Sequence, residues 1–256
     1  MGNRHSLYLR YLLLSLTLIP SATAAAETLK LAIANSTCDI FSQVNQRFSA
    51  AQPIQLELTC KASGLLAKGL QGKVIDADLF ISANQEWMDY MIKEKLVNPE
   101  EVTTPWRNHL VVATARSSAL AIDRWEDLAS PAVQEILIGD PSLAPFGRYA
   151  KQALQRTDLW PQVIHKISSR KNIAILAEDL NTAGEGSVGI LFGSNLTPGH
   201  RLLFRVNPDW HDAVRYYMAP LANSTKRDTV AKLISFLASD PITALFTEHG
   251  YISGQP

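Results

Sequence analysis

The sequence of 256 residues lacks an excess of charge of either sign, since 24 Lys and Arg residues balance 24 Asp and Glu residues. It has no basic stripe, and it therefore gives no sign of a nucleic-acid partner or of binding to an anionic membrane surface. Internal repeats, low-complexity tracts and long polar linkers are also missing. Such a chain has the length and composition of one large globular domain or of two lobes of ordinary size.

Signals of catalysis and of metal binding are equally scarce. No serine lies in a G-x-S-x-G elbow, and nothing identifies an acid–base pair of carboxylates. Residues 184–189 fit G-x-G-x-x-G, but they follow a predicted helix and open a predicted strand, the reverse of a dinucleotide-binding loop. The sequence therefore predicts a protein that is not an enzyme, has no cofactor and holds no metal through its side chains. Metal-ligand spacing is absent around His109, His165, His200, His211 and His249.

The N-terminus has the three parts of a secretory signal. Arg4, His5 and Arg10 precede a short apolar run at residues 11–19, and small residues then offer cleavage after Ala24 or Ala26. The apolar run is too short to span a bilayer of roughly 30 Å, and no later segment is apolar enough. We predict a signal peptide at residues 1–24 and expect the mature chain to be soluble and exported to the periplasm.

The chain has only two cysteines, Cys38 and Cys60. An even pair in an exported protein is usually a disulfide. Cys38 follows the first predicted strand and Cys60 ends the second, so both lie at one end of the sheet if the strands are parallel neighbours. A bridge would stabilise the fold by about 3 kcal/mol in the chain-entropy model. Free thiols near a ligand site are the alternative.

Strand and helix patterns alternate along the chain, which predicts an α/β fold with mainly parallel sheets. The first set has strands at 29–33, 54–58 and 77–81 and helices at 40–50, 65–70 and 86–95. A strand at 110–114 then leads into new material, and a second set follows with strands at 135–138 and 187–192 and helices at 125–128, 147–155 and 173–180. A strand at 214–219 and a helix at 225–239 follow.

A second set inserted into the first is the arrangement of a two-lobed clamshell of the type II-like class. We predict that residues 25–112 and 214–256 form the first lobe and that residues 113–213 form the second. In such folds a ligand lies between the lobes, at the carboxyl ends of the strands.

Three predicted strand-to-helix turns carry small or hydroxyl residues, at 35–37, 61–64 and 145–147. A helix N-terminus has unpaired N–H groups and the positive end of a dipole, so it can hold an anion. Each turn alone is also explained by ordinary helix capping. Three turns that converge on one cleft would form an oxyanion site.

Two blocks resemble signatures of the periplasmic molybdate-binding proteins, the capture subunits of molybdate ABC importers. Residues 77–90 (ADLFISANQEWMDY) resemble one signature, and residues 139–154 (GDPSLAPFGRYAKQAL) resemble another, in the right order. The resemblance covers about Leu29 to Tyr251. It implies a periplasmic solute-binding protein that captures a tetrahedral oxyanion, molybdate or tungstate, and passes it to the membrane permease of an ABC importer as a monomer.

The resemblance also implies a set of ligand-binding residues. The family holds its dianion with two serines, backbone amides and a tyrosine hydroxyl. Matched by motif, the serines fall on Ser36 and Ser63, and the amides of the second lobe fall on Phe146 and Ile173. The tyrosine position falls on Phe192, which keeps the ring and lacks the hydroxyl.

Because Phe192 lacks the hydroxyl of the family's tyrosine, the identity of the ligand is left open. A missing donor costs roughly 1 to 3 kcal/mol if a buried anion oxygen goes unpaired. Asn35, Thr37 or a backbone amide is a candidate replacement, as is the hydroxyl of Tyr216 or Tyr217. Another anion, a small phosphonate or carboxylate, or a sensory binding role are the alternatives. Lys61, Arg148 and Lys171 flank the turns, either as solvated rim residues or as a counter-charge.

Overall fold

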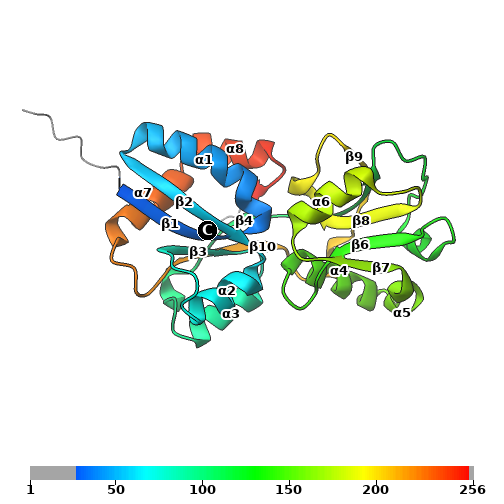
Figure 1. Cartoon of the computed structure of the whole chain (residues 1–256), viewed down its shortest axis with the longest axis horizontal. Coiled ribbons are helices and arrows are strands. Elements are labelled where there is room, and N and C mark those ends of the chain that lie inside the picture. The colour runs from blue at the N-terminus through cyan, green and yellow to red at the C-terminus, as the bar shows by residue number, and fades with distance from the viewer. Residues whose placement is uncertain (1–26, 254–256) are drawn as a thin grey trace, which may run out of the picture.

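The structure is a computed structural model that describes residues 27–253, and the predicted signal peptide at 1–24 lies outside the described residues. Figure 1 shows two lobes side by side, each built on one sheet with helices on both of its faces. The two-lobed α/β fold predicted from the sequence is therefore confirmed.

The first lobe contains a six-stranded sheet in the order β11-β4-β10-β3-β1-β2. Its buried centre is apolar on both faces, as strands covered by helices require. The strands are β1 (Glu27–Ala34), β2 (Ile54–Lys61), β3 (Leu79–Ser82), β4 (Thr103–Arg107), β10 (Arg215–Pro220) and β11 (Ile252–Ser253). The helices are α1 (Cys38–Ala51), α2 (Ser63–Gln71), α3 (Gln85–Lys93), α7 (Arg227–Leu237) and α8 (Asp240–Glu248).

The second lobe contains a five-stranded sheet in the order β7-β6-β8-β5-β9. Its strands are β5 (Leu110–Ala115), β6 (Glu135–Gly139), β7 (Ile167–Arg170), β8 (Ser187–Phe192) and β9 (His200–Arg205). Its α-helices are α4 (Pro145–Arg156), α5 (Trp160–Val163) and α6 (Ile173–Thr182). The segment predicted as a helix at 125–128 is a 3-10 helix, Trp125–Ala129.

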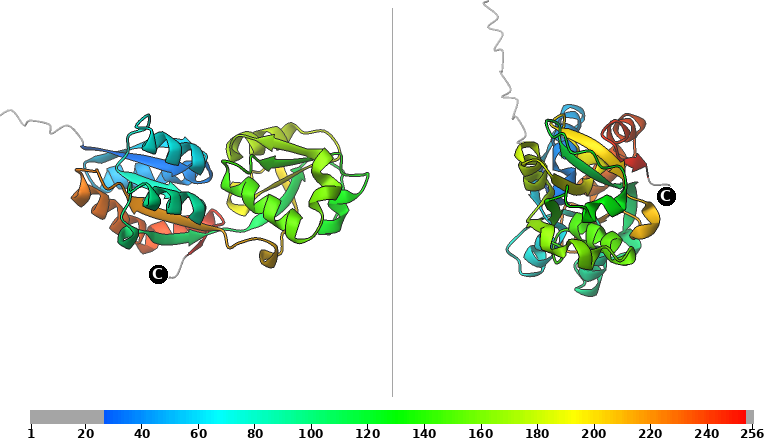
Figure 2. Two further views of the ribbon diagram at one scale, coloured as in Figure 1. Left: turned by 90° about the horizontal axis from the view of Figure 1, so that it is seen from below. Right: turned by 90° about the vertical axis from the view of Figure 1, so that its right-hand side faces the viewer.

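Both sheets are mixed, which corrects the prediction of mainly parallel sheets. Strands β2, β1 and β3 are parallel, as are β7, β6 and β8, and all six end at the side that faces the other lobe. Strands β5 and β10 enter their lobes from that side, because they follow the two crossings between the lobes (Figure 2). They must therefore run away from it, antiparallel to β8 and β3.

The first crossing lies earlier than predicted. A boundary between residues 112 and 113 would divide β5, whereas all of β5 pairs with β8 and β9 of the second sheet. The chain therefore leaves the first lobe at Asn108 and His109, between β4 and β5. It returns after β9, through residues 206–214.

A disulfide joins Cys38 to Cys60, with 6.0 Å between their Cα atoms, and this prediction is confirmed. The parallel register of β1 and β2 pairs Ile33 with Cys60, which brings the start of α1 beside the end of β2. The bridge closes a loop with a sequence separation of 22. In the chain-entropy model such a loop stabilises the fold by about 3 kcal/mol.

The helix predicted at 225–239 is confirmed as α7, and a second helix that was not predicted, α8, follows it directly. Helix α7 ends at Leu237 and α8 begins at Asp240, with Pro241 in its first turn. Proline lacks an N–H and its ring clashes with the preceding turn, so one helix cannot continue through it. No single helix within residues 27–253 is long and apolar enough to cross a membrane; α7 and α8 together have the length and composition but are bent by 63°.

Candidate functional site: an uncharged cavity between the lobes

A small cavity of about 10 Å³, roughly the space for one water molecule, lies where the two lobes meet. It is formed at the carboxyl ends of strands from both sheets, as the clamshell arrangement predicts. None of its lining residues carries a charge. They are Ala34, Asn35, Ser36, Ala62, Ser63 and Ala83 from the first lobe and Ala144, Pro145, Phe146, Asn172, Ile173 and Phe192 from the second.

Helix N-termini from both lobes meet at this cavity. The first lobe contributes the start of α2 and the short 3-10 helix Asn35–Thr37 that leads directly into α1. The second lobe contributes the starts of α4 and α6. The first-turn amides of Ser63, Phe146 and Ile173 have no hydrogen-bond partner within residues 27–253. Because these amides lie at positive ends of helix dipoles, the cavity favours negative charge without a cationic side chain.

Ser36 is one of the two buried serines of the cavity, with only 6% of its surface exposed. Its hydroxyl oxygen accepts a hydrogen bond from the Tyr216 hydroxyl at 3.0 Å. Its carbonyl oxygen accepts two more, from the Tyr251 hydroxyl at 2.7 Å and from the Asn195 side-chain amide at 3.2 Å. The residue is therefore held from both lobes at the edge of the cavity.

Ser63 is the second buried serine, fully enclosed at the first position of α2. Its hydroxyl oxygen accepts a hydrogen bond from the Ala83 backbone N–H at 3.1 Å. A serine hydroxyl has a single proton to donate. Within residues 27–253 no group accepts this proton, so it remains available for a ligand.

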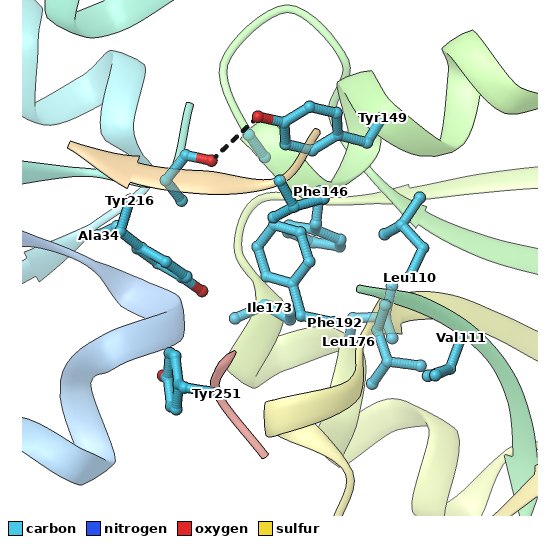
Figure 3. Close-up of a cluster of buried hydrophobic side chains, with 14 of the residues drawn as sticks. Ala34, Leu110, Val111, Phe146, Tyr149, Ile173, Leu176, Phe192, Tyr216 and Tyr251 are labelled. Carbon is cyan, nitrogen blue, oxygen red and sulfur yellow. Dashed lines mark hydrogen bonds between the residues drawn. The ribbon is translucent and has the colours of Figure 1, made fainter. Parts of the chain in front are cut away.

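The wall from the second lobe is aromatic and apolar. Figure 3 shows Phe146, Ile173 and Phe192 facing Ala34, Tyr216 and Tyr251 of the first lobe. The rings of Phe146 and Phe192 pack edge to face, with 6.1 Å between their centroids. Gly147 makes this possible, because a Cβ there would lie 2.0 Å from the Gly139 carbonyl oxygen and would push α4 away from β6.

The other predicted residues have different positions. Asn35 lines the cavity, and its side-chain oxygen accepts a hydrogen bond from the Ala174 N–H of the second lobe at 3.2 Å. Thr37 lies outside the lining, and its hydroxyl donates to the Ala34 carbonyl at 2.8 Å. The hydroxyl of Tyr217 is also remote from the lining and donates to the Gln85 side chain at 3.4 Å.

The three basic residues of the turns do not line the cavity. Lys61 and Lys171 are exposed. Arg148 pairs with Glu86 across the lobes, and its guanidinium lies 5.7 Å from the centre of the Trp87 ring. Partial burial lowers the pKa of Arg148 from its ordinary value, but the group remains a cation that joins the lobes rather than a ligand to an enclosed anion.

The comparison with known proteins identifies the family. Residues 29–252 match the bacterial extracellular solute-binding protein family. The chain belongs to this family. Among curated solute-binding proteins it is similar to the molybdate-binding protein ModA of Escherichia coli, with 26% identity over 248 residues that cover 93% of this chain and 94% of the relative.

Solved solute-binding proteins have the same fold. The periplasmic molybdate-binding protein of Azotobacter vinelandii superposes with a TM-score of 0.79 at 14% identity, covering 89% of this chain and 100% of that one. The sulfate-binding protein SubI of Mycobacterium tuberculosis superposes with a TM-score of 0.78 at 12% identity, covering 90% and 88%. The resemblance predicted from the sequence is confirmed at the level of the family and the fold.

Six residues of the cavity lining were not predicted to bind the ligand: Ala34, Ala62, Ala83, Ala144, Pro145 and Asn172. Ala83 follows β3 and presents its amide to Ser63. Asn172 precedes α6 and caps it by accepting from the Ile175 N–H at 2.9 Å. Asn172 could have been found as an ordinary N-cap residue. Ala83 has no local signal, because its position depends on the pairing of β3 with its neighbours.

Proposed function

We propose that this protein captures a small tetrahedral oxyanion, molybdate or tungstate, in the periplasm and delivers it to an ABC importer. The observation that carries this proposal is the uncharged cavity, in which two buried serines and unpaired helix amides are the polar groups suited to binding an anion. The molybdate-binding relatives support the same ligand. The protein would act as a monomer and without covalent chemistry.

The physical reason for this ligand is the balance of donors and acceptors. A fully ionised tetrahedral dianion has only acceptor oxygens, and it gains most from amides and hydroxyls in a site shielded from water. A protonated anion such as phosphate carries an O–H that needs an acceptor, and no carboxylate lines the cavity. We therefore expect molybdate, tungstate and sulfate to bind more tightly than phosphate.

Binding would also drive closure. The donors belong to both lobes, so an anion between them interacts more strongly with the closed arrangement than with an open one. A ligand shifts such an equilibrium by its difference in affinity for the two states. The permease of the importer would then recognise the closed surface.

A different anion is the second candidate, because Phe192 lacks a hydroxyl and Phe146 adds a ring to the wall. A cavity of about 10 Å³ is far smaller than the pockets that hold organic ligands. This size favours an inorganic oxyanion over a phosphonate or carboxylate with a substituent. A sensory role would use the same binding step with a different membrane partner.

Thermal unfolding of the mature protein with molybdate, tungstate, sulfate, chromate, phosphate and a small phosphonate tests the proposal. A ligand at 100 times its Kd stabilises the native state by about 2.7 kcal/mol. For a chain of this size this raises Tm by about 5 to 10 °C. A shift with molybdate and tungstate supports the proposal. A shift with only another anion supports the second candidate, and no shift with any of them overturns both.

A further inference from the structure

A chain of three buried polar side chains leads from the crossing between the lobes to the cavity. The side-chain amide of Asn108 donates to the Tyr216 hydroxyl oxygen at 3.3 Å, and the Tyr216 hydroxyl donates to the Ser36 hydroxyl oxygen at 3.0 Å. Tyr216 is fully buried, and less than a tenth of Asn108 and Ser36 is exposed. Of these three residues only Ser36 reaches the cavity lining.

Asn108 fixes which group donates and which accepts in this series of hydrogen bonds. The His109 backbone N–H, which can only donate, lies 2.9 Å from the Asn108 side-chain oxygen, so the other end of the side chain must be its NH₂ group. That NH₂ group can only donate, and it faces both Tyr216 and the Ser194 hydroxyl, which is 2.7 Å away. The Tyr216 oxygen therefore accepts from Asn108, and its own proton is free for Ser36.

The same argument continues to the cavity. The Ser36 oxygen accepts the Tyr216 proton, so the single proton of Ser36 must be donated elsewhere. Within residues 27–253 no group accepts it, and the cavity is the space that remains. Burial raises the pKa of Tyr216 to about 12, so its hydroxyl keeps its proton at neutral pH.

We propose that Tyr216 and Asn108 are positioning residues that hold the Ser36 hydroxyl as a donor directed into the cavity. They contact Ser36 and one another rather than the ligand. The inference rests on the proposed function in so far as the ligand is an anion, which needs donors only. Without the Tyr216 hydroxyl, the Ser36 hydroxyl would rotate freely between donating into the cavity and donating away from it.

This series of hydrogen bonds begins in the connection between the lobes, at Asn108. Asn108 lies in the first crossing, and its backbone N–H donates to the Val214 carbonyl of the second crossing at 2.9 Å. Ser194 belongs to the second lobe, in the 3-10 helix Gly193–Asn195. Asn108, which sets the direction of hydrogen-bond donation toward Ser36, therefore contacts both crossings and the second lobe.

A double-mutant cycle measures the effect on binding. The variants Tyr216→Phe, Ser36→Ala and the double variant are titrated calorimetrically with molybdate, or with the anion that stabilises the protein most. We expect Tyr216→Phe to weaken binding about tenfold, Ser36→Ala to weaken it at least as much, and the double variant to match Ser36→Ala alone. An unchanged affinity in Tyr216→Phe, or losses that add in full, would overturn the proposal.

The neighbouring Tyr217→Phe variant is the matched control. It also removes one tyrosine hydroxyl from β10, but that hydroxyl donates to Gln85 and not to the site. Its affinity should stay within about twofold of the wild type. A general effect of altering β10 would weaken binding in both tyrosine variants, and the tenfold loss in Tyr216→Phe would then not support the positioning role.

Neutron diffraction from ligand-free crystals of the wild type tests the same claim without a ligand. We expect a deuterium on the Tyr216 oxygen that points at the Ser36 oxygen, and a deuterium on Ser36 that points into the cavity. The reverse arrangement, with the Ser36 deuterium directed at Tyr216, would overturn the inference. If no oxyanion binds, the proposed function fails, and this measurement still decides the role of Tyr216.

Discussion

The side-chain oxygen of Asn35 in the first lobe accepts a hydrogen bond from the backbone N–H of Ala174 in the second lobe, at 3.2 Å. This contact caps the first turn of α6 from across the cleft. The Gly64 N–H makes a second contact of this kind with the Leu143 carbonyl, also at 3.2 Å. The lobes are therefore in contact around the cavity, and closure is stabilised by bonds between them as well as by a ligand.

Glu86 of the first lobe and Arg148 of the second form an ion pair between the lobes. We expect Glu86→Gln to lower ligand affinity by up to about fivefold at low salt, because an exposed pair contributes roughly 0 to 1 kcal/mol. The difference should shrink at high salt, since ions screen the pair. Calorimetric titration at two salt concentrations measures both effects.

The matched control for this variant is Asp76→Asn, which removes an exposed pair with Lys30 inside the first lobe. Its affinity should be unchanged at both salt concentrations. If Glu86→Gln behaves like Asp76→Asn, the pair between the lobes does not contribute to closure.

Removal of the Ser63 hydroxyl should weaken binding strongly. In Ser63→Ala the ligand loses a donor, and the buried Ala83 N–H loses its acceptor. We expect affinity to fall tenfold or more, together with a loss of about 1 kcal/mol in the free energy of unfolding. Calorimetry and urea denaturation measure the two quantities. The control is Ser42→Ala on exposed α1 surface, whose hydroxyl donates to the Cys38 carbonyl; an equal loss of affinity there would contradict the role of Ser63.

The Phe192→Tyr variant tests the position at which the molybdate-binding resemblance breaks down. The ring already lines the cavity, so a hydroxyl on it adds a donor to a site that needs donors. A hydrogen bond to a charged group contributes about 1.5 to 3 kcal/mol, so we expect molybdate affinity to rise about tenfold or more. The melting temperature without ligand controls for packing against Phe146 and Tyr149. Unchanged or weaker binding would mean that the anion needs no donor at this position.

Acidification should destabilise the protein through His200. The Thr197 N–H donates to its Nδ1 at 3.1 Å, so Nε2 carries the proton and donates to the Ala177 carbonyl at 2.8 Å. Burial lowers the pKa of His200 below its ordinary 6.5, and burial also lowers the pKa of His109 and His211. Below pH 6.5 the unfolded chain therefore binds protons that the folded chain does not, and the free energy of unfolding falls as pH falls.

Each of these histidines contributes at most about 1.4 kcal/mol per pH unit to this slope. Urea denaturation between pH 7.5 and 5 measures it. The His200→Gln variant should show a smaller slope, whatever its stability at pH 7.5. A slope equal to that of the wild type would show that His200 titrates alike in the folded and unfolded chain.

The second sheet shows why part of the fold could not be predicted. Strands β5, β6 and β8 are almost completely buried, and their apolar runs were recognised in the sequence. Strands β7 and β9 form the two edges of this sheet and are only partly buried, so they carry no clear apolar pattern and were missed. Strand β4 of the first sheet lies between β11 and β10, but it is also only partly buried, and it was missed too.

The sequence by itself determined the local features of this protein. Helix and strand periods, the hydroxyl-bearing turns and the cysteine pair depend on neighbouring residues, and they indicated the fold and the two serines. The tertiary structure decided how distant segments meet. Four helix N-termini converge because two sheets face one another across the crossings, and Tyr216 reaches Ser36 across 180 residues of sequence. No local pattern encodes these relationships, because the first depends on how the lobes face one another and the second on the place of β10 beside β3 in the first sheet.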